Sequence, residues 1–197
     1  MKAGFALTLL LAVSGLSAAA PPFACTKSPM ELDSVSLGRK MSDLIISKGQ
    51  GLAKFGAETG EPGYPSAITW TNRVFMLQVF FNSRQEAAMV VYSLLPPGQS
   101  SYLALSSAEP FKKIKLYEDN FHSIVKKLGP PASKDGPKVT ENYAQSSLNY
   151  TCGPDGKEQV SFLSRYLCRE AEGSACAAQS LNDDPHFLWG VRLKRIE

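Results

Sequence analysis

The strongest constraint on the fold is an apolar pattern that occurs twice, at an offset of about 79 positions. In the first copy Val35 and Leu37, separated by one residue, precede a short amphipathic stretch. In the second copy Ile114 and Leu116 do the same. Apolar residues at every second position indicate a strand, whereas spacings of three and four indicate a helix. We therefore expect a strand followed by a helix in each half of the chain.

The two expected helices cover residues 40–48 and 118–128. The second carries one apolar stripe at positions i, i+3, i+4 and i+7, formed by Phe121, Ile124, Val125 and Leu128. Gly129 ends this helix, because glycine adopts the left-handed conformation of a helix C-terminus and the two prolines that follow cannot continue the helix. The first helix ends near Gly49 in the same way.

Longer strands follow each helix. Residues 73–81 and 87–95 in the first half, and 159–168 and 186–196 in the second, are rich in β-branched and aromatic residues. The sequence therefore predicts an α+β protein of two tandem helix-plus-antiparallel-meander repeats, with the helices packed on one face of a curved sheet. The expected boundaries are a first repeat over 33–95, a linker over 96–111 and a second repeat over 112–197.

The N-terminus has the three parts of a secretory signal. Lys2 supplies the positive charge, residues 5–16 are almost entirely apolar, and residues 17–20 are small. We expect cleavage after Ala19, which leaves residues 20–32 as an N-terminal arm after the signal peptide over 1–19.

The protein is therefore expected to be periplasmic or secreted. Cys25 lies close behind the signal, so a lipid-anchored form is an alternative. Against it, Pro22 stands where bacterial lipidation usually has an aliphatic residue. No later segment has the length of apolar sequence that a membrane-spanning helix needs.

Four cysteines remain after export: Cys25, Cys152, Cys168 and Cys176. In an oxidising compartment an even number predicts two disulfides, for which three connectivities exist. Cys168 and Cys176 bracket a short polar loop containing Gly and Ser, so we pair these two. That choice leaves Cys25 to pair with Cys152. A zinc site is the alternative, but the sequence has no Cys-x-x-Cys spacing.

The composition and motifs argue against several functions. The net charge of +3 is scattered along the chain without a basic stripe, so we expect no nucleic-acid partner. No nucleophile elbow, zinc-protease motif or phosphate-binding glycine loop is present, so we expect no enzyme and no cofactor. His186 with Asp183 and Asp184 is a candidate metal site, although a turn explains the same residues. His122 is expected to be solvated on its helix.

The order of these segments resembles a small extracytoplasmic α/β repeat. That repeat occurs twice in β-lactamase inhibitory protein and once in the small lipoproteins that assist outer-membrane protein assembly. The stretches that carry the resemblance are VSLGRKMSDLI, IKLYEDNFHSIVKKLGPP, LNYTCGPDG and HFLWGVRLKR. The resemblance implies a protein-binding module whose helices cover one face of the sheet and whose other face and hairpin turns contact a partner. The hairpin at residues 71–73 has no carboxylate at its tip, so inhibition of a β-lactamase is not expected.

Strand alternation predicts which residues would face that partner. In the strand over 73–81 we expect Phe75, Leu77, Val79 and Phe81 beneath the helices. In the last strand we expect Trp189, Val191 and Leu193 in the core. The candidate binding residues are then Met76, Gln78, Phe80, Leu188 and Arg192. A one-residue error would invert these faces, and a segment such as 96–111 covering both faces is the other alternative.

The sequence thus predicts an exported protein-binding module, inhibitory or immunity-type, that acts on an envelope enzyme. An envelope-assembly or scaffold accessory is the alternative, and an enzyme or apolar-ligand carrier is a further one. The expected partner is another protein in the cell envelope or outside the cell.

Overall fold

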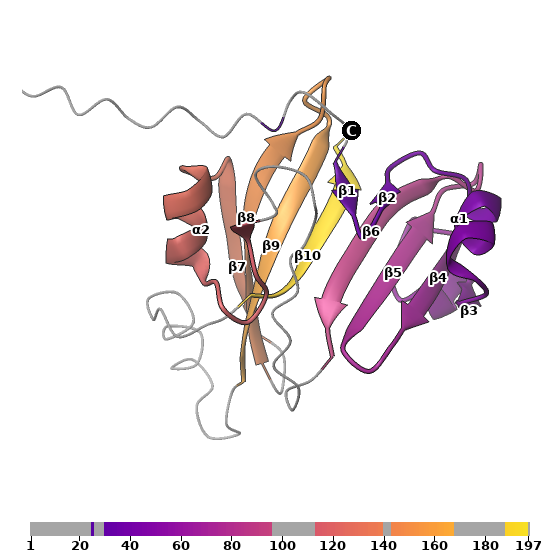
Figure 1. The fold of residues 1–197 in the computed structure, drawn as a ribbon, viewed down its shortest axis with the longest axis horizontal. Helices are drawn as coiled ribbons and strands as arrows, with labels where there is room; N and C mark the ends of the chain where they lie inside the picture. The colour runs from indigo at the N-terminus through magenta and orange to yellow at the C-terminus, as the bar shows by residue number, and fades with distance from the viewer. Residues whose placement is uncertain (1–24, 26–29, 96–112, 140–142, 168–187, 197) are drawn as a thin grey trace, which may run out of the picture.

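The computed structural model describes residue 25 and residues 30–95, 113–139, 143–167 and 188–196. One eight-stranded sheet dominates it, with the order β3-β4-β5-β6-β10-β9-β8-β7. Its strands are β3 (Leu52–Phe55), β4 (Ser66–Thr71), β5 (Phe75–Phe81), β6 (Ala87–Leu94), β7 (Ser133–Val139), β8 (Tyr143–Cys152), β9 (Glu158–Leu167) and β10 (Leu188–Arg195). All neighbours are antiparallel. Because β6 pairs with β10, both halves of the chain belong to one sheet (Figure 1).

The other elements are short. Helix α1 spans Met41–Lys48 and helix α2 spans Phe121–Leu128, eight residues each. A 3-10 helix, η1, covers Gly56–Thr59, and β1 (Glu31–Leu32) pairs with β2 (Val35–Ser36) in a separate two-stranded sheet. Figure 1 shows α1 beside the β3–β6 part of the large sheet and α2 beside the β7–β10 part.

The predicted fold class is therefore wrong. The described residues form a mostly β structure, one continuous antiparallel sheet with two short α-helices, not two tandem helix-plus-meander repeats with helices packed on a curved sheet. The two apolar pairs, Val35 with Leu37 and Ile114 with Leu116, were expected to form the first strand of each repeat, but the structure uses them differently. Val35 belongs to the small separate sheet, and Ile114 and Leu116 are fully buried in a segment outside the large sheet. An apolar-x-apolar pair suits a buried irregular segment as well as a strand.

The two faces of the large sheet differ. The main core lies on the face that we call the core face, where Leu77, Val79 and Phe81 of β5 pack with Leu44 of α1 and Ile124 of α2. Phe75 packs against the same cluster, so the face predicted for all four alternate β5 residues is confirmed. We call the other side of the sheet, which carries Gln78, Val91 and Arg192, the opposite face.

A buried carboxylate organises the start of α2. Asp119 accepts hydrogen bonds from the Lys127 ammonium at 2.6 and 2.8 Å, from the Ser123 hydroxyl at 2.8 Å and from the Lys115 backbone at 2.8 Å. The Asn120 side chain accepts a hydrogen bond from the Ser123 backbone in a capping box.

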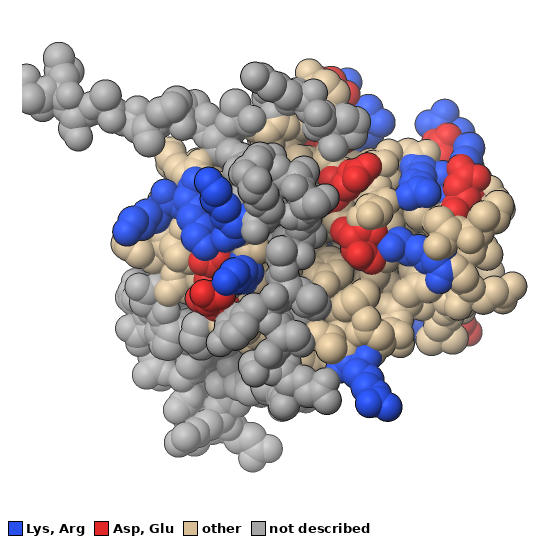
Figure 2. All heavy atoms as spheres, in the orientation of Figure 1, with Lys and Arg blue, Asp and Glu red and all other residues tan. Residues whose placement is uncertain are grey.

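On the face shown in Figure 2, Lys and Arg side chains gather over α2 and charges of both signs mix over α1. The helices therefore present a charged, solvated surface.

The N-terminal arm is tied to the large sheet. Cys25 and Cys152 form a disulfide, as predicted, and the described residues include no free cysteine. Cys168 and Cys176 lie outside the described residues, as do the expected signal peptide over 1–19 and linker over 96–111. Among the described residues, no helix is long and apolar enough to cross a membrane.

Candidate functional site

The opposite face carries a row of cross-strand neighbours that runs over six strands. The register places Thr69, Gln78, Val91, Arg192, Ser161 and Asn149 in one line, each on a different strand from β4 to β8. Antiparallel neighbours in such a line lie about 5 Å apart. The chemistry of the row changes along its length, from mixed residues in the first half of the chain to Arg192, Ser161 and Asn149 in the second.

The predicted binding residues divide into two groups. Met76, Gln78 and Arg192 are half-buried and lie on the opposite face, so the structure brings these three onto one surface. Phe80 lies on the same face but is only 2% exposed. It packs with Ala67 and Met89, and its ring lies 5.5 Å from that of Tyr64. Phe80 is therefore not the exposed anchor that we expected.

Leu188 lies on the wrong side of the sheet for the predicted role. It is fully buried in the main core, because the register between β9 and β10 shifts between Leu188 and Gly190. A bulge of this kind reverses the alternation of side chains before it. Trp189 was expected in the core. Its ring instead packs against the guanidinium of Arg165, whose Cζ lies 4.0 Å from the Trp189 ring centroid. Val191 and Leu193, which follow the bulge, are in the core as predicted.

A small hollow of about 60 Å³ lies on the opposite face, where four strands meet. Its walls come from Asp135 and Lys138 of β7, Gln145 and Ser147 of β8, Leu163 of β9 and Arg192 of β10. Gly136 completes the wall at a bulge of β7, where a Cβ atom would come within 2.6 Å of the Gln145 carbonyl oxygen. Glycine is therefore strongly favoured at this position, and polar side chains line most of the hollow.

Several buried polar atoms around the hollow have no partner. Within the described part of the chain, Arg192 Nε, Ser161 Oγ and Asn149 Oδ1 are inaccessible to solvent and make no hydrogen bond. The Asn149 amide group does donate, to Asp135 Oδ2 at 2.8 Å and to Ser133 Oγ at 3.0 Å. Buried polar groups without partners are uncommon and costly. Their concentration in one row marks this part of the face as the candidate site.

The sequence carried a signal for these residues that we did not use. In β8 the polar residues Gln145, Ser147 and Asn149 alternate with Ala144, Ser146, Leu148 and Tyr150, and three of these four are apolar or aromatic. Such alternation predicts one polar face on a strand. Ser161 follows the same rule in β9. Asp135 and Lys138 were not detectable in this way, because their strand contains a Gly-Pro step and few apolar residues.

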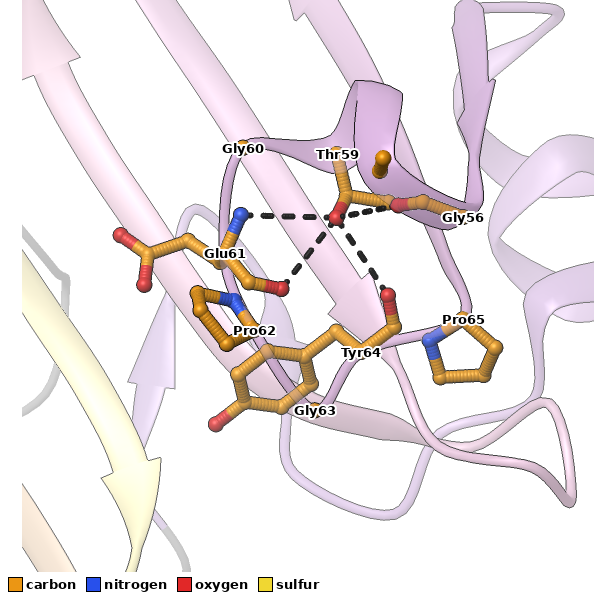
Figure 3. A pocket seen from close by; sticks show the side chains of 9 residues that line it. Gly56, Thr59, Gly60, Glu61, Pro62, Gly63, Tyr64 and Pro65 are labelled. Carbon is orange, nitrogen blue, oxygen red and sulfur yellow. Dashed lines mark hydrogen bonds between the residues drawn. The ribbon is translucent and has the colours of Figure 1, made fainter.

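A second, larger pocket lies at the loop around η1. It has a volume of about 630 Å³ and is lined by residues 56–65 of one continuous segment. Figure 3 shows Thr59 in its wall, where the hydroxyl lies 2.9 Å from the Gly56 carbonyl oxygen and close to two more carbonyls. These contacts hold the loop itself together. Because side chains from different elements do not converge there, this pocket is the weaker candidate.

The chemistry of the hollow suits binding. Arg192 and Lys138 supply positive charge, Asp135 supplies one negative charge, and Ser147 and Gln145 supply neutral donors and acceptors. In the described ranges no group of three or more His, Cys, Asp or Glu residues is placed to hold a metal ion. His122 lies exposed on α2, and His186 lies outside the described residues.

Comparison with known proteins adds little. No family model matches the chain, and no curated protein matches its sequence. Among solved structures, the chain is similar to a DUF4309 family protein (YjgB) from Bacillus subtilis. The sequence identity is 12% and the TM-score 0.48, over 87% of this chain and 90% of that chain. At this identity and TM-score the likeness carries no argument about function.

Proposed function

We propose that this chain is an exported binding protein that recognises another protein through the opposite face of its sheet. The observation that carries the proposal is Arg192, a half-buried arginine near the middle of the large sheet. Among the described residues its guanidinium has no hydrogen-bond or ion-pair partner, and its Nε is fully buried. The two terminal nitrogens of Arg192 are not among the enclosed atoms. A partner that supplies an acceptor to them would gain a charge-assisted hydrogen bond, which makes Arg192 a natural binding contact.

The surroundings of Arg192 support the same proposal. Met76 and Gln78 are half-exposed on the same face, and Trp189 with Arg165 adds an aromatic and a second guanidinium. Arg, Trp and Met are enriched where proteins bind one another. The Cys25–Cys152 disulfide supports export, because disulfides persist in oxidising compartments.

We further propose that the chain acts by occupying its partner rather than by catalysis, as an inhibitor of an envelope enzyme would. The described side chains of the hollow include Arg, Lys, Asp, Gln and Ser but no His or Cys, the side chains that most often act as bases and reactive thiols. An assembly accessory is distinguished from an inhibitor by what it captures.

The test is capture of a partner by the immobilised mature protein from an envelope extract of the source organism. We expect one protein to be captured by the wild type and at least about 30-fold less by Arg192→Ala, the loss expected for an interface hot spot. Arg195→Ala is the matched control. Arg195 lies on the same strand but is exposed and paired with Asp155 at 3.2 Å, so its removal should leave capture unchanged.

The identity of the captured protein separates the two modes of action. A hydrolase whose activity falls when the chain is added supports inhibition, whereas a component of an outer-membrane complex supports the assembly function. If Arg192→Ala and Met76→Asp both fold and capture the same proteins in the same amounts as the wild type, the opposite face is not the binding surface.

A further inference from the structure

The hollow beside Arg192 is too small for a whole ligand. Its volume of about 60 Å³ is several-fold below the roughly 300–1,000 Å³ of typical small-molecule sites. It has room for the end of one side chain, a group of a few heavy atoms. An occupant of this size must belong to a larger molecule that rests on the surrounding face.

The donors around the hollow favour an anionic occupant. Arg192 contributes the N–H groups of its terminal nitrogens, and Lys138 contributes an ammonium group. The Ser147 hydroxyl and the Gln145 amide add further donors. Asp135 is the one carboxylate in the wall among the described residues, and its Oδ2 already accepts the Asn149 amide at 2.8 Å. Positive charge therefore exceeds negative charge around the hollow.

The shape of the guanidinium narrows the choice of anion. The two terminal nitrogens of arginine form two parallel hydrogen bonds to a planar carboxylate. Nε of Arg192 is enclosed by the protein, so the two terminal nitrogens are the donors left for a ligand. A carboxylate in the hollow would pair with them and would receive the Lys138 charge from the β7 side.

We propose that the hollow receives the carboxylate of an acidic side chain from the partner protein, with Arg192 as its bidentate donor and Lys138 as a second cation. This inference rests on the proposed function, because it names the group of the partner that the opposite face recognises. The chemistry is shared by free carboxylates, so the contact is measurable without the partner.

The experiment uses the mature, disulfide-bonded chain labelled with ¹⁵N. The Nε–Hε resonance of Arg192, assigned by its absence from Arg192→Lys, is followed while acetate or N-acetylglutamate replaces chloride at constant ionic strength. We expect a saturable shift with half-saturation in the millimolar range. The resonance of Arg195, which is already paired with Asp155, is the internal control and should not follow the same curve. In Lys138→Gln the half-saturation concentration should rise several-fold.

Two outcomes would overturn the proposal. One is an Arg192 resonance that does not respond to either carboxylate, or responds only as Arg195 does. The other is a larger, saturable response to inorganic phosphate than to acetate, which would assign the hollow to a phosphate group. Neither outcome removes the proposed function, because capture of the partner by the wild type and by Met76→Asp is measured separately. Conversely, carboxylate binding at Arg192 without any captured protein would refute the proposed function and leave the anion site standing.

Discussion

Cys25 and Cys152, 127 positions apart in the chain, are bonded at the end of β8 with their Cα atoms 4.8 Å apart. The Gly153 backbone donates a hydrogen bond to the Cys25 carbonyl oxygen at 3.0 Å, so the arm is held by backbone as well as by sulfur. The bond closes most of the chain into one loop. It therefore restricts the unfolded state strongly.

Removal of this disulfide should destabilise the protein more than removal of any single hydrogen bond. We expect Cys25→Ala with Cys152→Ala to lower the free energy of unfolding by about 3–5 kcal/mol, measured by urea denaturation. Peptide mapping without reduction should also show Cys168 joined to Cys176, which stays a prediction. Equal stability of the variant and the wild type would contradict the proposed constraint on the unfolded chain.

Asp119 should be the most sensitive acidic residue of the α2 region. Asp119 is only 4% exposed, and its carboxylate accepts hydrogen bonds from the side chains of Ser123 and Lys127. We expect Asp119→Ala to lower the free energy of unfolding by about 2–3 kcal/mol, since hydrogen bonds to a charged group are lost and a donor is left buried. The neighbouring Glu118→Ala is the control. Glu118 is half-exposed, and its pair with Lys115 lies on the surface, so a loss within about 0.5 kcal/mol is expected. If Glu118→Ala lowered the free energy of unfolding as much as Asp119→Ala does, the buried hydrogen bonds of Asp119 would not explain its effect.

Glu158 gives the stability a defined pH dependence. Burial raises the pKa of Glu158, although the Met30 backbone N–H donates to its Oε2 at 2.9 Å and opposes the rise. The folded state therefore holds the proton at pH values where the unfolded chain has lost it, and stability falls as pH rises through that window. Glu158→Gln keeps an acceptor for Met30 and removes the charge. Its stability relative to wild type should increase as pH rises from the ordinary titration range of a Glu side chain through the raised pKa of Glu158.

Asp155 supplies a control of opposite sign for that measurement. The Lys157 backbone N–H lowers the pKa of Asp155, so the wild type gains stability as pH rises through the Asp155 window. The stability of Asp155→Asn relative to wild type should therefore decrease with pH, as followed by urea midpoints at several pH values. The same sign for both variants would show that overall charge, not local environment, determines the trend.

Local signals identified the elements, and long-range packing determined the rest. The spacing of Ile124 and Leu128 predicted α2, and the alternation of β5 predicted its core face. Val125, placed on the same stripe by its spacing, is instead 38% exposed, because the helix touches the core along a narrower stripe. β7 was missed because its Gly136-Pro137 step resembles a loop, and it becomes a strand only by pairing with β8.

The candidate site was also predictable only in part. Met76, Gln78 and Arg192 reach the opposite face by simple alternation, which the sequence displays. Leu188 does not, because one bulge in β10 reverses the alternation before Gly190 and nothing in the local sequence reveals it. The burial of Phe80 could not be predicted from the strand pattern either. The Tyr64 ring that packs over Phe80 comes from the loop that follows η1.

Phe80 and Met76 should now separate stability from binding. Phe80 lies on the opposite face but is buried against Tyr64 and Met89. Phe80→Ala should lower the free energy of unfolding by about 3–5 kcal/mol, the cost of truncating a buried aromatic residue. Met76 lies four positions earlier on the same strand and face, and it is half-buried. Met76→Ala should therefore lower stability by less than about 1 kcal/mol.

Binding should show the reverse order once the variants are compared at a temperature where each is folded. Met76→Ala should weaken partner capture, because its side chain is available to a partner, whereas Phe80→Ala should affect capture only through the fraction of unfolded protein. Affinity and melting temperature measured on the same samples distinguish the two effects. If Phe80→Ala leaves the melting temperature unchanged and abolishes capture, Phe80 is an interface anchor after all. The Tyr64 ring would then have to move away from it when the partner binds.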